Sequence, residues 1–359
     1  MGKLMPETRY KDSTDPIVTD GRDISPATAE LIGEAANQRS DGSPDTHIEA
    51  ILDAKKGPTE PDATDPTYYG RPMLQKSVWE VDIPIYYYVG GLTGASLVLA
   101  AAAQLNGSES ANRLMQHAHW IGVGGATVSG ALLIHDLGRP ERFLNMLRVF
   151  RPTSPMNVGA WILSSIAPLS MGALMFRGKR GLFGSAGEAM GFGAGLAGLG
   201  LSTYTGVLVS NSAVPVWQAS RHVLPILFGA SAMASAGGIL AIFADEQAQR
   251  FAISFGMAGR VAELAASQVL ERQVSEVPIV GQPLKKGRSG FYWKAASILT
   301  AASIVASFLP GRSRGKRIAA GVLANLGSLS LRLAINKAGE DSALEPRASF
   351  HQQRAGQGR

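Results

Sequence analysis

The sequence contains no cysteine among its 359 residues. Cysteine thiolates are the usual ligands of iron-sulfur clusters, and a disulfide needs two of them. The chain therefore neither holds such a cluster through sulfur nor cross-links itself. Any iron-sulfur cluster that works with this chain must lie in another subunit.

The first residues, Met1-Gly2-Lys3-Leu4-Met5-Pro6, lack the apolar core of a secretory signal peptide. Charged residues make up only 17% of the chain, and their distribution is uneven. Residues 1–83 are polar and rich in proline, whereas long apolar runs follow one another from Pro84 onward. We therefore expect no cleaved leader, and insertion into a membrane that depends on the first apolar run.

The apolar runs are about 20 residues long, which is enough to cross about 30 Å of hydrocarbon. They do not alternate in polarity as barrel strands do, so the spans must be helices. The ranges are 84–105, 117–135, 157–176, 190–210, 221–243, 249–271, 291–309 and 318–336. The sequence predicts an all-α polytopic membrane protein with about eight transmembrane helices in two four-helix bundles.

Three regions follow from this pattern. The segment 1–83 is a polar N-terminal extension that is partly disordered or bound to a partner, since it has too little apolar surface to offset chain entropy. The transmembrane bundle covers 84–336, and 337–359 form a polar C-terminal tail. Small residues at four-residue spacing inside the spans, such as Gly90 with Gly94, predict close helix packing.

The net charge of +6 does not indicate nucleic-acid binding, because the basic residues cluster in loops beside the spans. Arginine and lysine are divided almost equally between the two sides, so the positive-inside rule does not orient the chain. We expect a multi-pass protein of the inner (cytoplasmic) membrane. The long tail without a leader favours a cytoplasmic N-terminus.

Polar side chains gather at one end of the predicted bundle. With eight spans, odd spans begin and even spans end on the N-terminal side, so residues from several span ends should meet there. A quinone head group needs hydrogen-bond donors for its two carbonyl oxygens and groups that exchange protons. The candidate quinone-binding residues are Trp79, Glu80, Asp82, Tyr86, His135, Asp136, Arg139, Tyr204 and Asn211.

His135 can donate or accept a proton near neutral pH, and Asp136 can take a proton or orient the imidazole. A structural hydrogen bond for His135 and a plain salt bridge between Asp136 and Arg139 or Arg142 are the alternatives. His117 lies on the opposite side, since 18 residues of helix separate it from His135, about 27 Å.

Arg260 and Glu263 lie near the middle of a predicted span, three residues apart on one helix face. A charge in mid-bilayer is costly, so both side chains should face the bundle interior or water. Together with Asp136 they are candidates for a proton path. The alternative is a neutralised structural pair.

Two other interpretations of the whole chain remain open. Histidines on spans also ligate haem, but two haems are hard to assign here because the histidines on the far side lack partners. We expect no haem, iron-sulfur cluster or other metal in this chain. The chain can also be a purely structural anchor, or a proton- or solute-conducting subunit, without its own quinone site.

Several motifs resemble those of the NrfD/PsrC membrane-anchor family of polysulfide reductase-type complexes. The matching stretches cover about 68–245: Tyr69-Gly70-Arg71-Pro72, Trp79-Glu80, Ile83-Pro84, Tyr88-Val89-Gly90-Gly91-Leu92, HDLGRPERF from His135 to Phe143, Arg151-Pro152-Thr153-Ser154-Pro155-Met156, Tyr204-Thr205-Gly206-Val207-Leu208, Ser210-Asn211 and Ala213-Val214-Pro215-Val216-Trp217. The N-terminal extension lies outside the resemblance.

The resemblance implies an eight-helix subunit of a respiratory oxidoreductase that exchanges electrons with menaquinone or ubiquinone. It also implies two partners, a ferredoxin-like 4Fe-4S subunit and a molybdenum or tungsten bis-pterin catalytic subunit. The soluble N-terminal tail favours the cytoplasmic side for the N-terminus and, with it, for these partners. The HDLGRP and RPTSPM stretches are most similar to anchors of formate dehydrogenase-type enzymes. Glu80, Asp82 and Tyr86 replace the histidine and asparagine of the polysulfide reductase form, so the head-group ligands differ from that form, whereas His135 and Asp136 carry over from the family motif.

Overall fold

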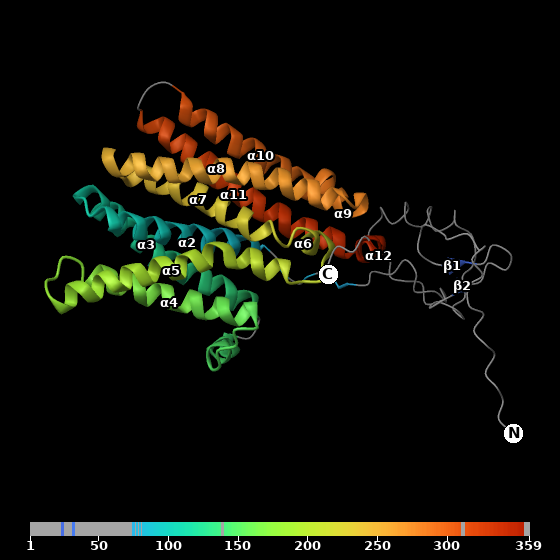
Figure 1. Ribbon diagram of the computed structural model, residues 1–359, viewed down its shortest axis with the longest axis horizontal. Helices are drawn as coiled ribbons and strands as arrows, with labels where there is room; N and C mark the ends of the chain where they lie inside the picture. Colours follow the sequence, from blue (N-terminus) through green and yellow to red (C-terminus); the bar gives the residue numbers. More distant parts are fainter. Residues whose placement is uncertain are drawn as a thin grey trace. The chain divides into compact units, whose positions relative to one another are not determined.

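The computed structural model describes residues 23–24, 31–32, 74, 75, 77, 79, 81–137, 140–309 and 313–354 (Figure 1). The chain divides into two units, Met1–Pro72 and Met73–Arg359. In the first unit, β1 (Asp23–Ile24) pairs antiparallel with β2 (Leu31–Ile32). Most of the predicted N-terminal extension lies outside the described residues.

The second unit begins with a bundle of four long helices. These are α2 (Asp82–Asn106), α3 (Glu109–Asp136), α4 (Pro155–Met175) and α5 (Leu182–Ser210), with the short 3-10 helix η3 (Pro140–Leu147) between α3 and α4. α2 packs on α3 and α5, and α4 packs on α3 and α5.

Four more long helices form a second bundle beside the first (Figure 1). They are α7 (Leu224–Phe243), α8 (Glu246–Ser275), α10 (Gly287–Phe308) and α11 (Arg314–Ala343). Three short helices, α6 (Pro215–Ala219), α9 (Pro278–Lys285) and α12 (Pro346–Arg354), lie at one end of this bundle. α2 and α5 of the first bundle pack on α7, and α2 also packs on α11. α11 and α12 extend into the range predicted as the C-terminal tail.

The predicted all-α, polytopic membrane architecture is confirmed. Each of the eight ranges predicted to span overlaps one of the long helices. In the described part of the chain, six helices are long and apolar enough to cross a membrane: α2, α4, α5, α7, α10 and α11. α3 and α8 carry more polar residues, so the count of eight spans stays a prediction.

Local signals in the sequence explain where helices begin and end. Ser108, Ser154 and Ser313 each accept a hydrogen bond from a backbone N–H of the first turn that follows, which caps α3, α4 and α11. Pro155 occupies the first turn of α4, where no N–H is needed. Gly107 ends α2 with a φ of +67°, a conformation that favours glycine.

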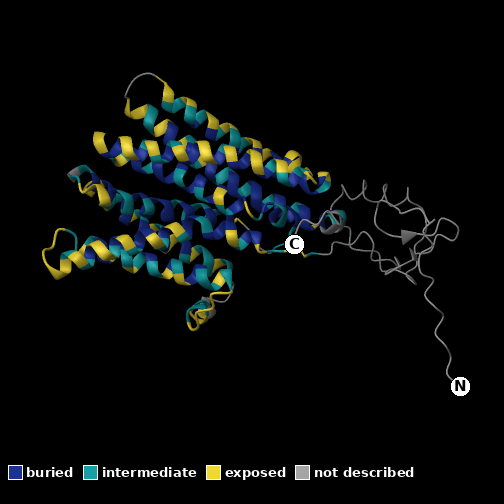
Figure 2. Ribbon diagram, viewed as in Figure 1, coloured by how far each residue is buried: buried dark blue, intermediate teal, exposed yellow. Residues whose placement is uncertain are grey.

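Burial is distributed as expected for a protein with lipid around it (Figure 2). The helix faces that meet inside the two bundles are buried, while large apolar side chains such as Leu196, Ile226 and Ile298 are exposed on the outer faces. Such exposed apolar surface would be a liability in water. In a bilayer these side chains contact acyl chains.

The first bundle is held together by backbone-to-backbone contact between α2 and α5. A Cβ on Gly94 would collide with the carbonyl oxygen of Gly198 and approach the nitrogen of Ser202 to 2.7 Å. Neither backbone atom can move out of the way as a side chain would. This contact explains why small residues recur in these two helices.

We predict that Gly94→Ala destabilises the protein by about 1–3 kcal/mol through overpacking, visible as a lower unfolding midpoint in detergent. Gly124→Ala is the matched control, because a Cβ at Gly124 meets nothing within 4 Å. A Gly94→Ala protein that is as stable as the control would contradict the close approach of α2 and α5.

Candidate functional site

Asp82 and His135 join the start of α2 to the end of α3. The Asp82 Oδ2 atom lies 2.7 Å from the His135 Nδ1 atom. The His135 side chain is 81% exposed and that of Asp82 is 29% exposed. Asp82 therefore fixes the imidazole at the surface of the bundle, at the mouth of the candidate site.

This hydrogen bond comes from a residue 53 positions away in the chain, which the sequence did not indicate as a partner of His135. The role expected for the neighbouring Asp136 stays a prediction. Consecutive residues on a helix point about 100° apart, so His135 and Asp136 face different directions. His135 turns outward to Asp82, and Asp136 is less exposed.

Three tyrosines lie behind this pair and form the tyrosine cluster (Tyr86, Tyr87 and Tyr204). All three are buried, and the Tyr86 and Tyr87 rings lie 5.8 Å apart. Tyr87 is close enough to Tyr204 and Asp136 to interact electrostatically with both. The Tyr87 hydroxyl has no hydrogen-bond partner among the described residues, although buried hydroxyls normally have one.

The Tyr204 ring occupies the space that a side chain would fill on α4. A Cβ on Gly159 would overlap the Tyr204 ring, so the absence of a side chain there lets the ring lie between α4 and α2. Sequence reasoning identified Tyr86 and Tyr204 but missed Tyr87. The signal was present in the three consecutive tyrosines 86–88, which place hydroxyls on more than one face of α2.

Two tryptophans form an aromatic wall beside the tyrosine cluster. Trp79 stacks on Trp217 with ring centroids 5.8 Å apart and meets the Tyr87 ring edge-on at 6.5 Å. Trp217 belongs to α6 and donates from Nε1 to the carbonyl oxygen of Ile335 at 2.8 Å. Trp79, predicted as a site residue, is thus held by both bundles.

The other predicted site residues stand apart from this cluster or outside the described residues. Asn211 is exposed and donates to the carbonyl oxygen of Val207 at 2.9 Å, as a residue does when it ends a helix. Glu80 and Arg139 lie outside the described residues. The Tyr86 and Tyr87 rings are thus neighbours, Tyr204 and Asp136 act electrostatically on Tyr87, and Asp82 and His135 are hydrogen-bonded to each other at the surface.

The second bundle contains a buried carboxylate, Glu263, which is 1% exposed. Its Oε1 atom accepts a hydrogen bond from Thr300 of α10 at 2.6 Å, while its Oε2 atom has no partner among the described residues. The nearest positive charges that act on it belong to Arg332 and Arg260. A buried carboxylate with one open oxygen can exchange a proton with a neighbouring group.

Arg260 lies one turn before Glu263 and is also buried. It does not form a direct ion pair with Glu263 in the described structure. Its Nη1 atom donates instead to the hydroxyl of Ser307 at 2.7 Å. The two charges predicted as a neighbouring pair therefore point to different places on α10.

Arg332 of α11 was not predicted, and it lies where the two bundles meet. It is 1% exposed. Its Nη2 atom donates to the carbonyl oxygen of Phe228 at 2.9 Å, and its guanidinium lies 3.8 Å from the centre of the Phe228 ring. Tyr87 packs against the other side of this contact, with its ring 6.1 Å from that of Phe228. Arg332 therefore connects the surroundings of Glu263 to the tyrosine cluster.

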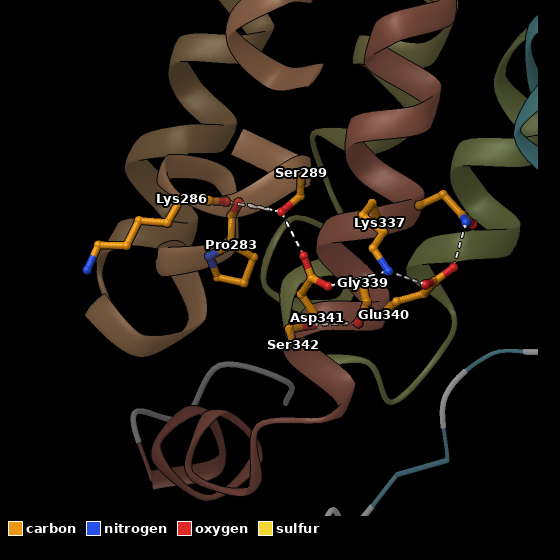
Figure 3. Close-up of polar contacts among 9 residues, drawn as sticks. Pro283, Lys286, Ser289, Lys337, Gly339, Glu340, Asp341 and Ser342 are labelled. Carbon is orange, nitrogen blue, oxygen red and sulfur yellow. Dashed lines mark hydrogen bonds and ion pairs between the residues drawn. The ribbon is translucent and has the colours of Figure 1, made fainter. Parts of the chain in front are cut away.

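The polar row on α11 continues from Arg332 to the end of the helix. Asn336 and Glu340 follow at four-residue spacing and are hydrogen-bonded to each other at 3.2 Å. Figure 3 shows the end of this row, where Lys337 donates to Glu340 at 2.8 Å and Ser289 of α10 donates to Asp341 at 2.8 Å. This end of α11 is on the same side of the bundle as Asp82 and His135, because α2 begins and α3 and α11 end there.

The described residues include no group of three or more histidine, cysteine, aspartate or glutamate side chains that could hold a metal ion. His222 accepts a hydrogen bond at Nε2 from its neighbour Arg221 at 3.1 Å. The polar groups at this end are suited to hydrogen bonding and proton exchange.

One family model matches most of the chain. Its description is "Polysulphide reductase, NrfD", and the match covers residues 71–339. No curated protein matches the sequence. The matched range includes the tyrosine cluster, Glu263 and Arg332.

Proposed function

We propose a quinone site in this chain, because the chain belongs to the polysulphide reductase NrfD family. Members of this family are membrane-anchor subunits of molybdoenzyme-type complexes that interact with quinone. The proposed site is the tyrosine cluster with Asp136. In this proposal the chain exchanges electrons between the quinone pool and a partner subunit. Menaquinone and ubiquinone present the same two carbonyl oxygens to such a site.

One observation carries the proposal. Groups from three helices meet in an aromatic, largely buried setting: Tyr87 from α2, Asp136 from α3 and Tyr204 from α5. The unpartnered Tyr87 hydroxyl fits a carbonyl oxygen of a head group. Asp136, near the surface, is suited to pass protons to and from it. A quinone supplies the two-electron chemistry when bound, and the chain supplies hydrogen bonds, a proton and exclusion of water.

Asp82 and His135 would serve the same site from its edge. Their hydrogen bond gives a titratable imidazole a fixed position at the surface. From there His135 can relay protons between water and Asp136. Trp79 and Trp217 close the site on the side of the second bundle.

We propose that the partner subunits dock at this same end. Electrons reach a quinone here only if a cluster lies close by, and the chain has no cysteine to ligate one. A ferredoxin-like 4Fe-4S subunit, followed by a molybdenum or tungsten bis-pterin subunit of formate dehydrogenase type, would meet that need. Exposed Val149, Phe150 and Arg151 beside η3 give this end a surface that suits a protein partner.

In this arrangement the chain lies in the inner membrane with its N-terminus and its partners on the cytoplasmic side.

Proton movement is a second candidate function, and Glu263 is the observation that favours it. The proposed path joins Asp136 to Glu263 through Tyr87 and Arg332, with Arg260 as a second positive charge beside Glu263. Unpartnered polar atoms occur at three of these steps: Tyr87 Oη, Arg332 Nη1 and Glu263 Oε2. Such atoms can bond water inside a membrane protein, and intramembrane charges commonly mark proton relays.

The quinone site is tested by Gly159→Ala in the assembled complex. The added Cβ displaces the Tyr204 ring, so we expect the KM for quinone to rise by about tenfold to 10²-fold, as a 1 Å misplacement of a site group can produce. Turnover is followed with quinone and, separately, with an artificial acceptor that takes electrons from the partner subunits. The artificial-acceptor rate should not change.

Gly130→Ala on α3 serves as the control, since a Cβ there meets nothing within 4 Å. Equal quinone kinetics in the two variants would favour the other reading, a structural anchor or conducting subunit without its own quinone site.

A further inference from the structure

A cavity of about 250 Å³ opens at the other end of the second bundle, where α8 and α11 begin and α7 and α10 end. It is therefore separate from the tyrosine cluster and from the docking end. We call it the basic cavity and define it by Arg250, Arg260, Ser307, Lys316 and Arg317, which line it together with Glu246 and Gln249.

Positive charge dominates its lining. Four cationic side chains face one carboxylate, that of Glu246. Among the described residues, no carboxylate lies within ion-pairing distance of Arg250, Arg260 or Arg317. Cations that outnumber the acids of a cavity repel one another, so such a group is stabilised by an anion between them.

Arg260, the most buried cation of the cavity, has a hydrogen-bond donor without an acceptor in the described part of the chain. Arg260 is 3% exposed. Its Nη1 atom is used by Ser307, but its Nε atom is buried without a hydrogen-bond partner among the described residues. Leaving a charged donor unpaired is costly, and Arg260 lines the cavity.

Neighbouring groups suit an oxyanion. α11 begins at the cavity, so its N-terminal partial positive charge adds to that of the side chains. With the Gln249 amide oriented to satisfy both groups, its oxygen accepts from Arg317 and holds that guanidinium in the lining. The planar guanidinium group of arginine can donate two parallel hydrogen bonds to the oxygens of a phosphate.

Apolar residues at the rim indicate where the anion comes from. Ile253 and Leu309 line the cavity, and exposed Phe308 and Ile318 continue an apolar surface along the outer faces of α10 and α11. Basic pockets between membrane helices near the interface bind anionic head groups. We propose that the basic cavity binds the phosphate of an anionic phospholipid, whose acyl chains lie along this surface.

A water-filled entrance for protons is the competing use of the basic cavity. The excess of positive charge opposes it, because a cationic funnel lowers the local concentration of hydronium. The unpaired donor and the apolar rim both favour a lipid phosphate.

The test uses the whole complex, delipidated in detergent and titrated with phosphatidylglycerol, phosphatidylcholine or inorganic phosphate while binding is followed by native mass spectrometry and by the unfolding midpoint. We expect phosphatidylglycerol to bind tightly and to raise the midpoint. Arg250→Gln with Arg317→Gln should weaken that binding by about tenfold to 10²-fold, since each charge-assisted hydrogen bond contributes strongly.

Arg180→Gln is the matched control, because Arg180 is an exposed arginine in the turn between α4 and α5, at the same end but outside the cavity. It should bind phosphatidylglycerol as the unaltered protein does. If the double variant does not assemble, binding of phosphatidylglycerol is compared with the single variant Arg250→Gln. Arg250 is exposed, so its substitution leaves the core intact.

Binding of phosphatidylcholine as tight as that of phosphatidylglycerol, or a double variant that binds like the control, would overturn the proposal. Tight binding of inorganic phosphate that the double variant loses would retain the phosphate site and overturn its assignment to lipid.

Discussion

Asp136→Asn is expected to lower quinone turnover by the assembled complex by about 10²-fold, the usual contribution of a positioned proton-transfer group. Asparagine keeps the size and hydrogen-bonding capacity of the side chain but cannot take up a proton. Asp136 is a carboxylate that acts electrostatically on Tyr87. The loss should therefore appear in turnover more than in assembly.

The measurement compares quinone turnover with turnover of an artificial acceptor that bypasses this chain. The second rate should be unchanged, because the partner subunits are untouched. Glu141→Gln is the matched control: Glu141 is an exposed carboxylate at the same end, in η3. A loss of equal size in both variants would show a general charge effect, and no loss in Asp136→Asn would remove Asp136 from the site.

Arg332→Met should destabilise the protein by about 1–3 kcal/mol, the range expected when a buried hydrogen-bonding group loses its partner. The substitution removes one of the two positive charges that act on Glu263, whose carboxylate stays buried at 1% exposure. It also removes the donor that bonds the Phe228 carbonyl oxygen. Both losses fall at the interface between the two bundles.

A double-variant cycle separates these contributions. Glu263→Gln keeps the hydrogen bond with Thr300 and removes the negative charge. Combined with Arg332→Met it should restore most of the lost stability, measured as the unfolding midpoint in detergent. Arg288→Met is the surface control, since Arg288 is exposed at the start of α10. If the two substitutions simply add, Arg332 and Glu263 do not interact.

Hydrophobic patterning located the long helices well, because lipid demands continuous apolar stretches and leaves few other ways to satisfy the backbone. α8 shows where such patterning weakens. Arg260 and Glu263 lower its apolar character, yet both are buried against α10. A helix that carries buried charges is thus hard to recognise as a span.

The candidate site was predictable in its parts but not in its contacts. Polar residues at span ends indicated the end of the bundle at which Asp82 and His135 meet. The hydrogen bond between Asp82 and His135, and the position of Asn211 on the outside, depend on how each helix is rotated about its axis, which packing decides. Arg332 was missed although the rule applied to Arg260 covers it equally, because an arginine inside an apolar run is costly unless it is paired.

The position of Arg332 has a consequence for biogenesis. Helices enter the membrane in the order of synthesis, and α11 follows α8 in the chain. Glu263 is therefore synthesised before Arg332, while contacts of α2, α3 and α5 with α7 and of α3 with α8 already join the two halves. Insertion of α11 then adds Arg332 to the charges that act on Glu263, and adds the contacts of α11 with α2 and α7 to those between the two bundles.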